Sequence, residues 1–273
     1  MTKYFVDNLD SSVSGKLLEI LEYKVEELDS LKKGLSVEQI KQAISNKEFD
    51  LRNFFKALDI KNEISLIAEI KKASPSEGDI NTEVDIVEQA RQYELAGANV
   101  ISVLTDKRFF KGDIGFLQQI KNVVSVPILR KDFIFDEYQV YESKLCGADA
   151  ILLMATILPE NKLIELVDLT HELGMECLVE THTRADMEKA LKTKAKVIGI
   201  NARDLQTFEV NLQHVIDLAL QFPKDRILIA ESGIKTGEDV KRLKNVGAQG
   251  ILVGTTLMQV KDLSAKIKEL KLI

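Results

Sequence analysis

The sequence predicts a closed (β/α)8 TIM barrel with a helical N-terminal extension, and three observations lead to this fold class. The chain has 273 residues, close to the typical barrel length of about 250. From Ser65 onward, apolar runs of strand length alternate with amphipathic segments, which is the pattern of parallel strands joined by helices. A repeat with a period of 50 residues spans two such units. Eight units of about 25 residues therefore fit between Ser65 and the C-terminus.

Eight apolar runs are the expected strands. They are Leu66–Ile70, Val100–Leu104, Val126–Leu129, Ala150–Met154, Glu176–Val179, Val197–Ile200, Ile227–Ala230 and Ile251–Val253. The repeat has the pattern G-A-x-x-I at Gly97, Gly147 and Gly247, with a degenerate copy at Lys194. We expect each glycine to end a helix in a left-handed conformation. An open doubly wound sheet is the structural alternative, but the segment after the first run holds no G-x-G-x-x-G fingerprint.

Residues 1–60 are predicted to form a helical extension packed on the barrel, so that residues 1–273 make one domain. Apolar residues recur at helical spacing from Leu17 to Leu28, which indicates an amphipathic helix. Ser36 begins a capping-box pattern for a second helix, and Asp50 is the expected N-cap of a third. The alternative is an independent binding module. No linker rich in Pro, Gly or Ser separates this region from Ser65, which favours one folded unit.

Composition and charge exclude several classes of partner. The net charge is −6, from 43 acidic and 37 basic residues, so we expect no general binding to nucleic acid or acidic membranes. Residues 1–8 lack the pattern of a signal peptide, and no apolar run approaches the roughly 18 residues of a membrane span. We therefore expect a soluble cytoplasmic protein.

Cysteine and histidine spacing predicts no metal site. Cys146 and Cys177 form no C-x-x-C pair, and a reducing compartment is the simplest interpretation. The histidines are far apart, and His171 and His214 lie in charged helical segments where surface positions are expected. His182 follows a strand end and is retained as a candidate functional residue.

Polar residues follow most of the expected strands, where barrel enzymes place their chemistry. Such residues are Glu69 and Lys71, Arg130 to Asp132, Glu180, Asn201 to Asp204, Glu231 to Gly233, and Gly254 to Thr256. One charge alone could belong to a solvated loop or a structural ion pair, but a ring of them indicates a site. We expect lysines in this mouth to have lowered pKa values and carboxylates raised ones, which suits acid–base chemistry.

The last two strands end in small residues, Ser232-Gly233 and Gly254-Thr255. Backbone N–H groups can approach an anion closely there, and a short helix starting near Thr256 would complete the usual barrel phosphate site. The residues alone therefore support a small phosphorylated substrate and general acid–base catalysis without a metal or cofactor.

Six motifs in order resemble those of the indole-3-glycerol-phosphate synthase family. They are Ala68–Ser76, Leu129–Phe133, Leu178–Glu180, Gly199–Leu205, Ala230–Gly233 and Val253–Met258. The resemblance covers the whole chain and implies the same fold. It also implies cofactor-free ring closure, decarboxylation and dehydration of 1-(2-carboxyphenylamino)-1-deoxyribulose 5-phosphate in tryptophan biosynthesis.

The resemblance also implies residue roles. Lys131 is the expected general acid, Glu180 a second proton-transfer group, and Glu69 with Lys71 would serve the dehydration. The expected substrate contacts are Asn201 and Glu231 for hydroxyls, Ser74 and Arg203 for the carboxylate, and Leu104, Phe110, Phe133 and Leu152 for the aromatic ring. The expected phosphate contacts are Lys71, Ser232, Gly233, Gly254 and Thr255.

Two other functions are alternatives. Phosphoribosylanthranilate isomerase would need a cysteine after the first strand and an aspartate after the sixth, where this chain has Lys71 and Asn201. A noncatalytic phosphate-ligand sensor would keep the phosphate site but has no need of Glu69, Lys131 and Glu180 together. We expect a monomer or weak oligomer.

Overall fold

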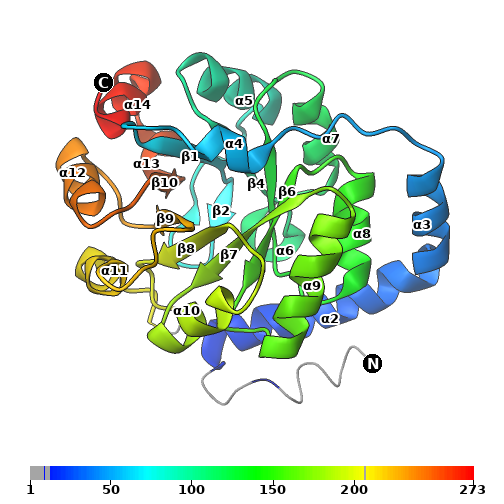
Figure 1. Cartoon of the computed structure of the whole chain (residues 1–273). Helices are drawn as coiled ribbons and strands as arrows, with labels where there is room; N and C mark the ends of the chain where they lie inside the picture. Colours follow the sequence, from blue (N-terminus) through cyan, green and yellow to red (C-terminus); the bar gives the residue numbers. More distant parts are fainter. Residues whose placement is uncertain (1–8, 10–12, 206) are drawn as a thin grey trace.

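A computed structural model describes Leu9 and residues 13–205 and 207–273 of the chain. The segment Met1–Asn8, on which the expectation of no signal peptide was based, lies outside the described residues. A closed barrel of eight parallel strands forms the centre of the molecule, in the order β1-β10-β9-β8-β7-β6-β5-β4, with β4 pairing back to β1 (Figure 1). The predicted fold class is confirmed. The barrel strands are β1 (Ser65–Ile70), β4 (Val100–Leu104), β5 (Ile128–Lys131), β6 (Ala150–Met154), β7 (Glu176–Thr181), β8 (Val197–Asn201), β9 (Ile227–Glu231) and β10 (Gly250–Val253).

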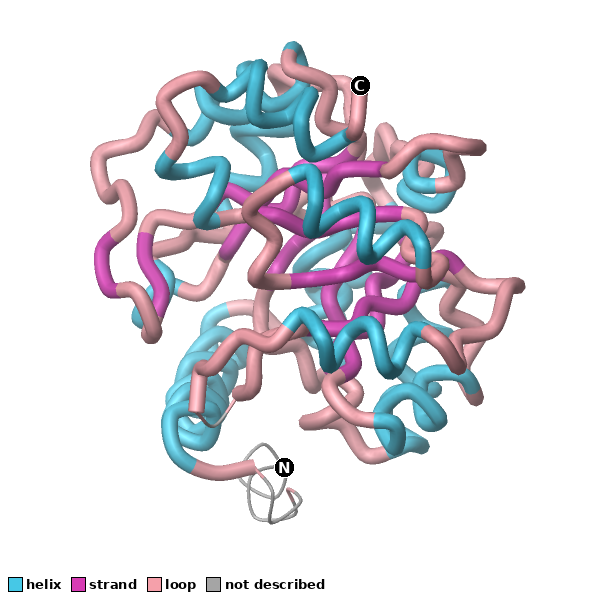
Figure 2. Tube along the Cα trace, turned by 90° about the vertical axis from the view of Figure 1, so that its left-hand side faces the viewer, coloured by secondary structure: helices cyan, strands magenta, loops and turns pink. Residues whose placement is uncertain are grey.

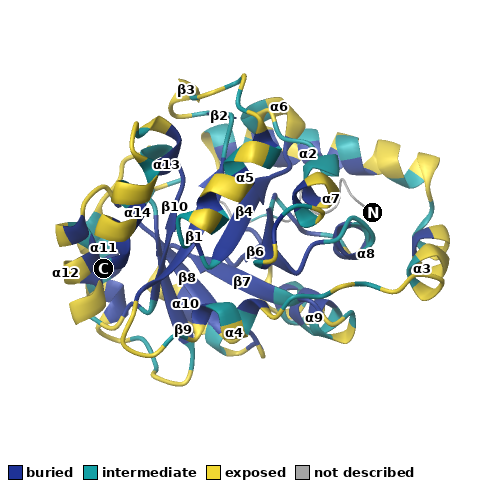
Figure 3. Ribbon diagram, turned by 90° about the horizontal axis from the view of Figure 1, so that it is seen from above, coloured by how far each residue is buried: buried dark blue, intermediate teal, exposed yellow. Residues whose placement is uncertain are grey.

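Helices surround the strands, as the tube view shows (Figure 2). After the extension they are α5 (Ile86–Leu95), α6 (Lys107–Phe110), α7 (Gly115–Lys121), α8 (Glu137–Leu145), α9 (Glu160–Glu172), α10 (Arg184–Leu191), α11 (Leu212–Ala219), α12 (Gly237–Asn245), α13 (Thr255–Gln259) and α14 (Leu263–Lys271). Seen from above, the strands are buried while the outer helical faces are exposed (Figure 3). Apolar side chains of strands and inner helical faces thus form one continuous core.

The G-A-x-x-I repeat acts as predicted. Gly97, Gly147 and Gly247 have φ values of 100°, 89° and 100°, a left-handed conformation that L-residues with a Cβ rarely adopt. Each glycine follows a helix, and the buried alanine after it lies two residues before the next strand begins. The repeat therefore marks the turn from helix to strand.

Strand boundaries differ from the prediction mainly at their C-terminal ends. The third barrel strand begins at Ile128 rather than Val126, because Pro127 has no N–H to donate to a sheet. The expected apolar runs stop one or two residues short of the observed strand ends, and the strands themselves include Lys131, Glu180, Asn201 and Glu231. These polar side chains are therefore held by regular strand geometry and not by loops.

The extension contributes α2 (Gly15–Gly34), α3 (Val37–Ser45) and α4 (Phe54–Leu58). Ser36 and Gln39 form the predicted capping box of α3. The prediction of Asp50 as N-cap of α4 is wrong: Asn53 caps this helix, and its Oδ1 accepts a hydrogen bond from the Lys56 amide at 2.7 Å. Asn is as good an N-cap as Asp, so the sequence pattern allowed either.

These helices contact the barrel at several places. α3 packs against α8, and α4 lies against β1 and β4 (Figure 1). Just before α4, the Arg52 amide donates to Asp149 at 2.7 Å, and the Arg52 guanidinium donates to the carbonyl of Val126 at 2.9 Å. Both partners lie at the N-terminal ends of strands, whereas α2 contacts loops at the opposite end. The extension thus reaches from one end of the barrel to the other.

A two-stranded hairpin, β2 (Ala73–Ser74) with β3 (Gly78–Asp79), follows β1 directly. It is antiparallel and lies outside the barrel sheet. The turn between its strands holds Ser76 and Glu77, which reach the cavity described next.

Candidate active site

A cavity of about 1110 Å³ opens at the C-terminal ends of the barrel strands. It is slightly larger than the usual upper range of small-molecule sites. His182, a candidate from the sequence, does not line the cavity. The predicted acid–base, substrate and phosphate residues all line it: Glu69, Lys71, Ser74, Leu104, Phe110, Lys131, Phe133, Leu152, Glu180, Asn201, Arg203, Glu231, Ser232, Gly233, Gly254 and Thr255. The structure therefore brings these residues to one place, while their individual roles remain predictions.

The floor of the cavity holds one lysine among carboxylates. Lys131 Nζ lies 3.2 Å from Glu180 Oε2 and 3.6 Å from Glu231 Oε2, and Glu69 is close enough to act on its charge. Glu69, Lys131, Glu180 and Glu231 come from β1, β5, β7 and β9, which are the first, third, fifth and seventh strands of the barrel. Alternate strands of such barrels contribute side chains to the same interior layer. These four residues accordingly meet, although up to 162 positions separate them in the sequence.

Electrostatics in this layer differ from the sequence prediction for the lysine. Burial alone would lower the pKa of Lys131, but the carboxylates of Glu180, Glu231 and Glu69 outweigh burial and raise it well above its usual value. The expectation of a lowered lysine pKa is therefore wrong for Lys131. The sequence indicates that lysines lie at the mouth, but it does not show that the nearest charged neighbours of Lys131 are carboxylates.

The two nearest carboxylates have opposite pKa shifts. Burial favours the neutral form of Glu180, yet the charge of Lys131 and the hydrogen bonds from Glu231 and Asn201 outweigh burial and lower the pKa of Glu180. Burial, and then repulsion from Glu180, raise the pKa of Glu231 well above its usual value. Two buried carboxylates beside one cation cannot both ionise easily. Of the two carboxylates, Glu180 is thus the one whose anionic form is favoured beside Lys131, and Glu231 is the one whose neutral form is favoured.

Glycine makes room for these carboxylates. A Cβ at Gly199 would lie 2.0 Å from Glu231 Oε1, and a Cβ at Gly254 would lie 2.5 Å from Glu69 Oε1. Both distances are too short for any side chain to be accommodated without displacing the carboxylate. Gly254 was predicted only as a phosphate contact, so its second role beside Glu69 was missed.

One side of the cavity is formed by Ser232, Gly233, Gly254 and Thr255, which we call the anion cradle. Ser232 and Gly233 both have left-handed φ values, 67° and 74°, a backbone shape whose successive N–H groups can point at one anion. Lys71 also lines the cavity, and its Nζ lies 3.3 Å from Glu69 Oε1. Sequence reasoning missed three more cations along the cavity wall: Lys235, Arg242 and Lys266.

Another part of the wall is apolar. The rings of Phe110 and Phe133 lie 6.2 Å apart at a tilt of 42°, and Leu104 and Leu152 are nearby lining residues. Leu17 and Ile20 of α2 also line the cavity, a contribution that the sequence analysis did not predict. The sequence shows that these residues are apolar and recur at helical spacing, but this pattern alone does not indicate which surface the helix packs against.

The turn between β2 and β3 reaches across the cavity mouth. Glu77 accepts a hydrogen bond from the Thr255 hydroxyl at 2.7 Å and lies 3.6 Å from the Arg203 guanidinium. Arg203 also donates to Ser76 at 3.1 Å, and Ser76 contacts Ser74 at 3.4 Å. Here a carboxylate of the protein contacts the anion cradle, so an incoming phosphate would have to replace it.

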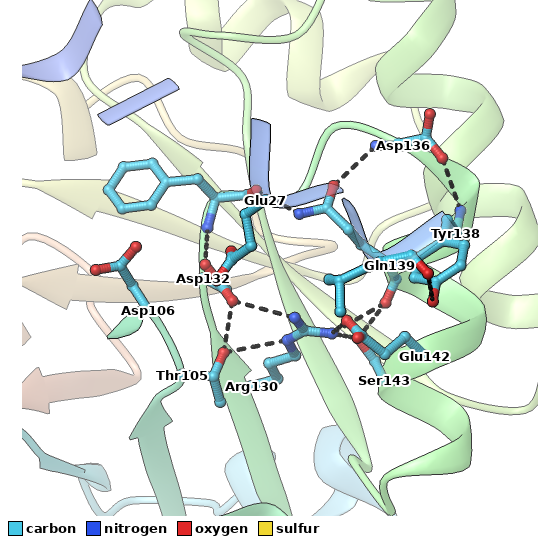
Figure 4. A network of polar contacts seen from close by, with 12 residues as sticks. Glu27, Thr105, Asp106, Arg130, Asp132, Asp136, Tyr138, Gln139, Glu142 and Ser143 are labelled. Carbon is cyan, nitrogen blue, oxygen red and sulfur yellow. Dashed lines mark hydrogen bonds and ion pairs between the residues drawn. The ribbon is translucent and has the colours of Figure 1, made fainter. Parts of the chain in front are cut away.

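A buried network supports the strand that carries Lys131 (Figure 4). Asp132 Oδ2 accepts from the Thr105 hydroxyl at 2.7 Å and from Arg130 Nη2 at 3.1 Å. Its other oxygen, Oδ1, lies 2.9 Å from Lys24 Nζ of α2. Thr105 just after β4, Arg130 of β5 and Lys24 of the extension therefore hold the residue next to Lys131 in one position.

Within the described ranges, no group of three or more His, Cys, Asp or Glu residues is arranged to hold a metal ion. Among the described helices, none is both long and apolar enough to cross a membrane. Cys177 lies buried in β7, away from the mouth.

The closed barrel, the acid–base layer and the adjoining anion cradle define a barrel of the class that handles phosphorylated small molecules. The chain belongs to the indole-3-glycerol phosphate synthase family, whose sequence model matches residues 17–270. An indole-3-glycerol phosphate synthase of Streptococcus pneumoniae (strain CGSP14) is 47% identical over 256 residues, which are 94% of this chain and 97% of that protein. One of Acetivibrio thermocellus is 46% identical over 221 residues, 81% of this chain and 85% of that protein.

Solved structures support the fold alone. A 3-hexulose-6-phosphate synthase is 14% identical and aligns with a TM-score of 0.62, over 77% of this chain and 99% of that one. At this identity the likeness concerns the barrel and says nothing of the reaction.

Proposed function

We propose that this protein is an indole-3-glycerol-phosphate synthase, a carboxy-lyase of tryptophan biosynthesis. Its substrate would be 1-(2-carboxyphenylamino)-1-deoxyribulose 5-phosphate, and its products indole-3-glycerol phosphate, carbon dioxide and water. The observation that carries the proposal is the position of Lys131, 3.2 Å from Glu180 on the floor of a cavity that also contains the anion cradle and the apolar wall. A phosphate and an aromatic ring could bind at these two sites with the reacting carbons between them.

Lys131 would act as the general acid of ring closure. As the aromatic carbon attacks the substrate ketone, negative charge develops on the ketone oxygen. The carboxylates around Lys131 keep this lysine protonated, so that a cation is in place before the reaction begins. The alkoxide that forms is more basic than the neutral amine of Lys131, so it can take the proton although the pKa of Lys131 is raised.

Loss of carbon dioxide then follows, because it restores the aromatic ring once the carbon–carbon bond exists. The remaining dehydration needs a base to remove a proton and an acid to protonate the leaving hydroxyl. Glu180 would be the principal base, since Lys131 holds it in the ionised form. Glu69 and Lys71, 3.3 Å apart, would assist this step.

The other lining residues would bind the substrate. Asn201 and the protonated Glu231 would bond to its hydroxyls, and Arg203 with Ser74 would hold the carboxylate until it leaves. Lys71, Ser232, Gly233, Gly254 and Thr255 would hold the phosphate, after Glu77 has left Thr255. Leu104, Phe110, Phe133 and Leu152 would face the ring. We further propose that residues 1–273 act as one domain, as a monomer or weak oligomer in the cytoplasm, without a cofactor.

The test is to supply the carboxyphenylamino-deoxyribulose phosphate and follow indole fluorescence. We expect turnover by the wild-type protein and none by Lys131→Met, which keeps the side-chain length but removes the charge. Inorganic phosphate should bind both proteins similarly, as measured by calorimetry. A folded wild-type protein that binds phosphate without producing fluorescence would favour the noncatalytic sensor, and wild-type kcat in the variant would refute the acid role of Lys131.

A further inference from the structure

His182 lies directly behind Glu180, outside the cavity lining. It follows β7 and is 9% exposed. Its Nε2 is 3.4 Å from Glu180 Oε1, whereas Lys131 contacts the other oxygen, Oε2. Its Nδ1 is 3.0 Å from the Thr156 hydroxyl. His182 therefore contacts the proposed base without lining the cavity itself.

The hydrogen bonds around Asp186 determine which nitrogen of His182 carries the proton. One oxygen of Asp186, Oδ2, accepts from the backbone amides of His182 and Thr183, at 3.2 and 3.1 Å, and from the Thr156 hydroxyl at 3.0 Å. A hydroxyl has a single proton, and Thr156 donates it to Asp186. Thr156 can then only accept from His182. Neutral His182 must accordingly carry its proton on Nδ1 and present a lone pair at Nε2.

That lone pair faces a carboxylate oxygen. Among the described residues, Nε2 of His182 has no hydrogen-bond partner, although it is fully buried. A nitrogen acceptor and an anionic oxygen at 3.4 Å repel each other unless a proton lies between them. One additional proton between His182 Nε2 and Glu180 Oε1 would therefore give both buried atoms a hydrogen-bond partner.

We propose that His182 is a positioning and proton-relay residue, which stores the proton that Glu180 removes from the substrate and returns it later in the same turnover. The proposal rests on the function proposed above. When Glu180 takes a proton, the carboxylic acid can pass it to Nε2, which gives an imidazolium and regenerates the carboxylate. The reverse transfer returns the proton to Glu180, from which it leaves with the hydroxyl as water. The relay itself neither gains nor loses a proton. Lys131 regains from solvent the proton that it gave to the ketone oxygen, because loss of the carboxylate as carbon dioxide consumes one proton.

The surroundings of His182 suit such a role. The charged groups that act on it are Glu180 of β7, Asp186 of α10, Lys131 of β5 and Asp204 after β8. Burial lowers the pKa of His182 below its usual value, Lys131 lowers it further, and the carboxylates partly oppose this. His182 is consequently neutral near pH 7 and able to accept a proton. Glu180 and Asp186 would stabilise the imidazolium once it forms.

The first experiment compares His182→Gln with His171→Gln. Glutamine can bond to Thr156 and Glu180 but cannot bind a proton. His171 is a matched control, because its Nε2 is also 3.4 Å from a carboxylate, that of Glu176, yet neither residue lines the cavity. We expect kcat of His182→Gln to fall about tenfold or more with KM within about threefold, and His171→Gln to be unchanged.

The pH profile separates a proton role from a structural one. Wild-type kcat should fall at acid pH as the Glu180–His182 pair becomes protonated and can no longer accept the substrate proton. In His182→Gln this acid limb should move to lower pH, because the ionisation of the imidazole is gone. Wild-type kcat in the variant, or an unmoved acid limb, would overturn the proposal.

The second measurement uses the wild-type protein, so it does not depend on whether a variant folds. The chain has 3 histidines, so ¹⁵N-labelled imidazole signals of the wild-type protein can be resolved by NMR. We expect neutral His182 to carry its proton on Nδ1; a proton on Nε2 would overturn the relay. If the wild-type protein does not turn over the substrate, the proposed function fails and the relay with it. An active wild type with an unaffected His182→Gln refutes the relay alone.

Discussion

Replacing Lys24 of α2 tests whether a buried charge attaches the extension to the barrel. Lys24 is 3% exposed, and its Nζ lies 2.9 Å from Asp132 Oδ1, 3.6 Å from Asp106 Oδ2 and 2.5 Å from Glu27 Oε2. These carboxylates outweigh burial and raise the pKa of Lys24 above its usual value. Lys24→Met keeps the length of the side chain and its apolar packing but removes the charge.

The expected magnitude follows from what the variant leaves behind. Asp132 retains Arg130, at 3.1 Å, as its cation. Asp106 Oδ2 is buried and without a hydrogen-bond partner among the described residues, so Lys24 is the cation that compensates it. Removing one partner of a buried ion pair typically costs about 3–5 kcal/mol, since it leaves a buried charge unpaired. We expect a loss of that size in the free energy of unfolding.

Urea unfolding at pH 7, followed by circular dichroism, measures this loss. Lys16→Met is the matched control, because Lys16 is on the same helix and pairs with Glu19 at 2.7 Å, but both side chains are substantially exposed. Exposed pairs contribute about 0–1 kcal/mol. If Lys24→Met lost less than about 1 kcal/mol, or no more than the control, the buried network would not hold the extension in place.

Three further substitutions probe the cavity. Glu180→Gln should lower kcat by about a hundredfold or more with little change in KM, since the base is lost but no binding group; steady-state kinetics showing the reverse would indicate a binding role. Glu77→Gln should tighten inorganic phosphate binding by about two- to fivefold in calorimetry, because a partly exposed anion no longer competes at Thr255. Weaker phosphate binding would contradict this competition. Gly199→Ala should lower kcat/KM by about tenfold or more and destabilise the fold by roughly 1–3 kcal/mol, because its Cβ would collide with Glu231. Wild-type kinetics and melting temperature would show that the carboxylate can move aside.

Much of the site could be predicted because, in a barrel, the place of a residue along its strand determines where its side chain lies. Each strand ends at the same rim, so a polar residue after an apolar run is already assigned to the mouth. Lys131, Glu180 and Glu231 were identified in this way. The helix-to-strand turns at Gly97, Gly147 and Gly247 were equally local, since a left-handed turn needs glycine whatever surrounds it.

Contacts between distant segments could not be predicted in this way. Nothing local distinguishes Leu17 and Ile20 from core residues, yet they line the cavity. Asp50 and Asn53 are comparable caps by sequence, and Asn53 takes the position. Glu77 is a loop carboxylate by sequence, and only the fold places it against Thr255.

The sequence by itself therefore determined the barrel, its eight strands and the chemical types at its mouth, because these depend on periodicity and on residues adjacent in the chain. Only the tertiary structure decided the electrostatics. It placed Glu69, Lys131, Glu180 and Glu231 in one layer, raised rather than lowered the pKa of the lysine, and put His182 behind Glu180. The physical reason is that a pKa depends on burial and on charges within a few ångströms, which come here from strands far apart in the sequence.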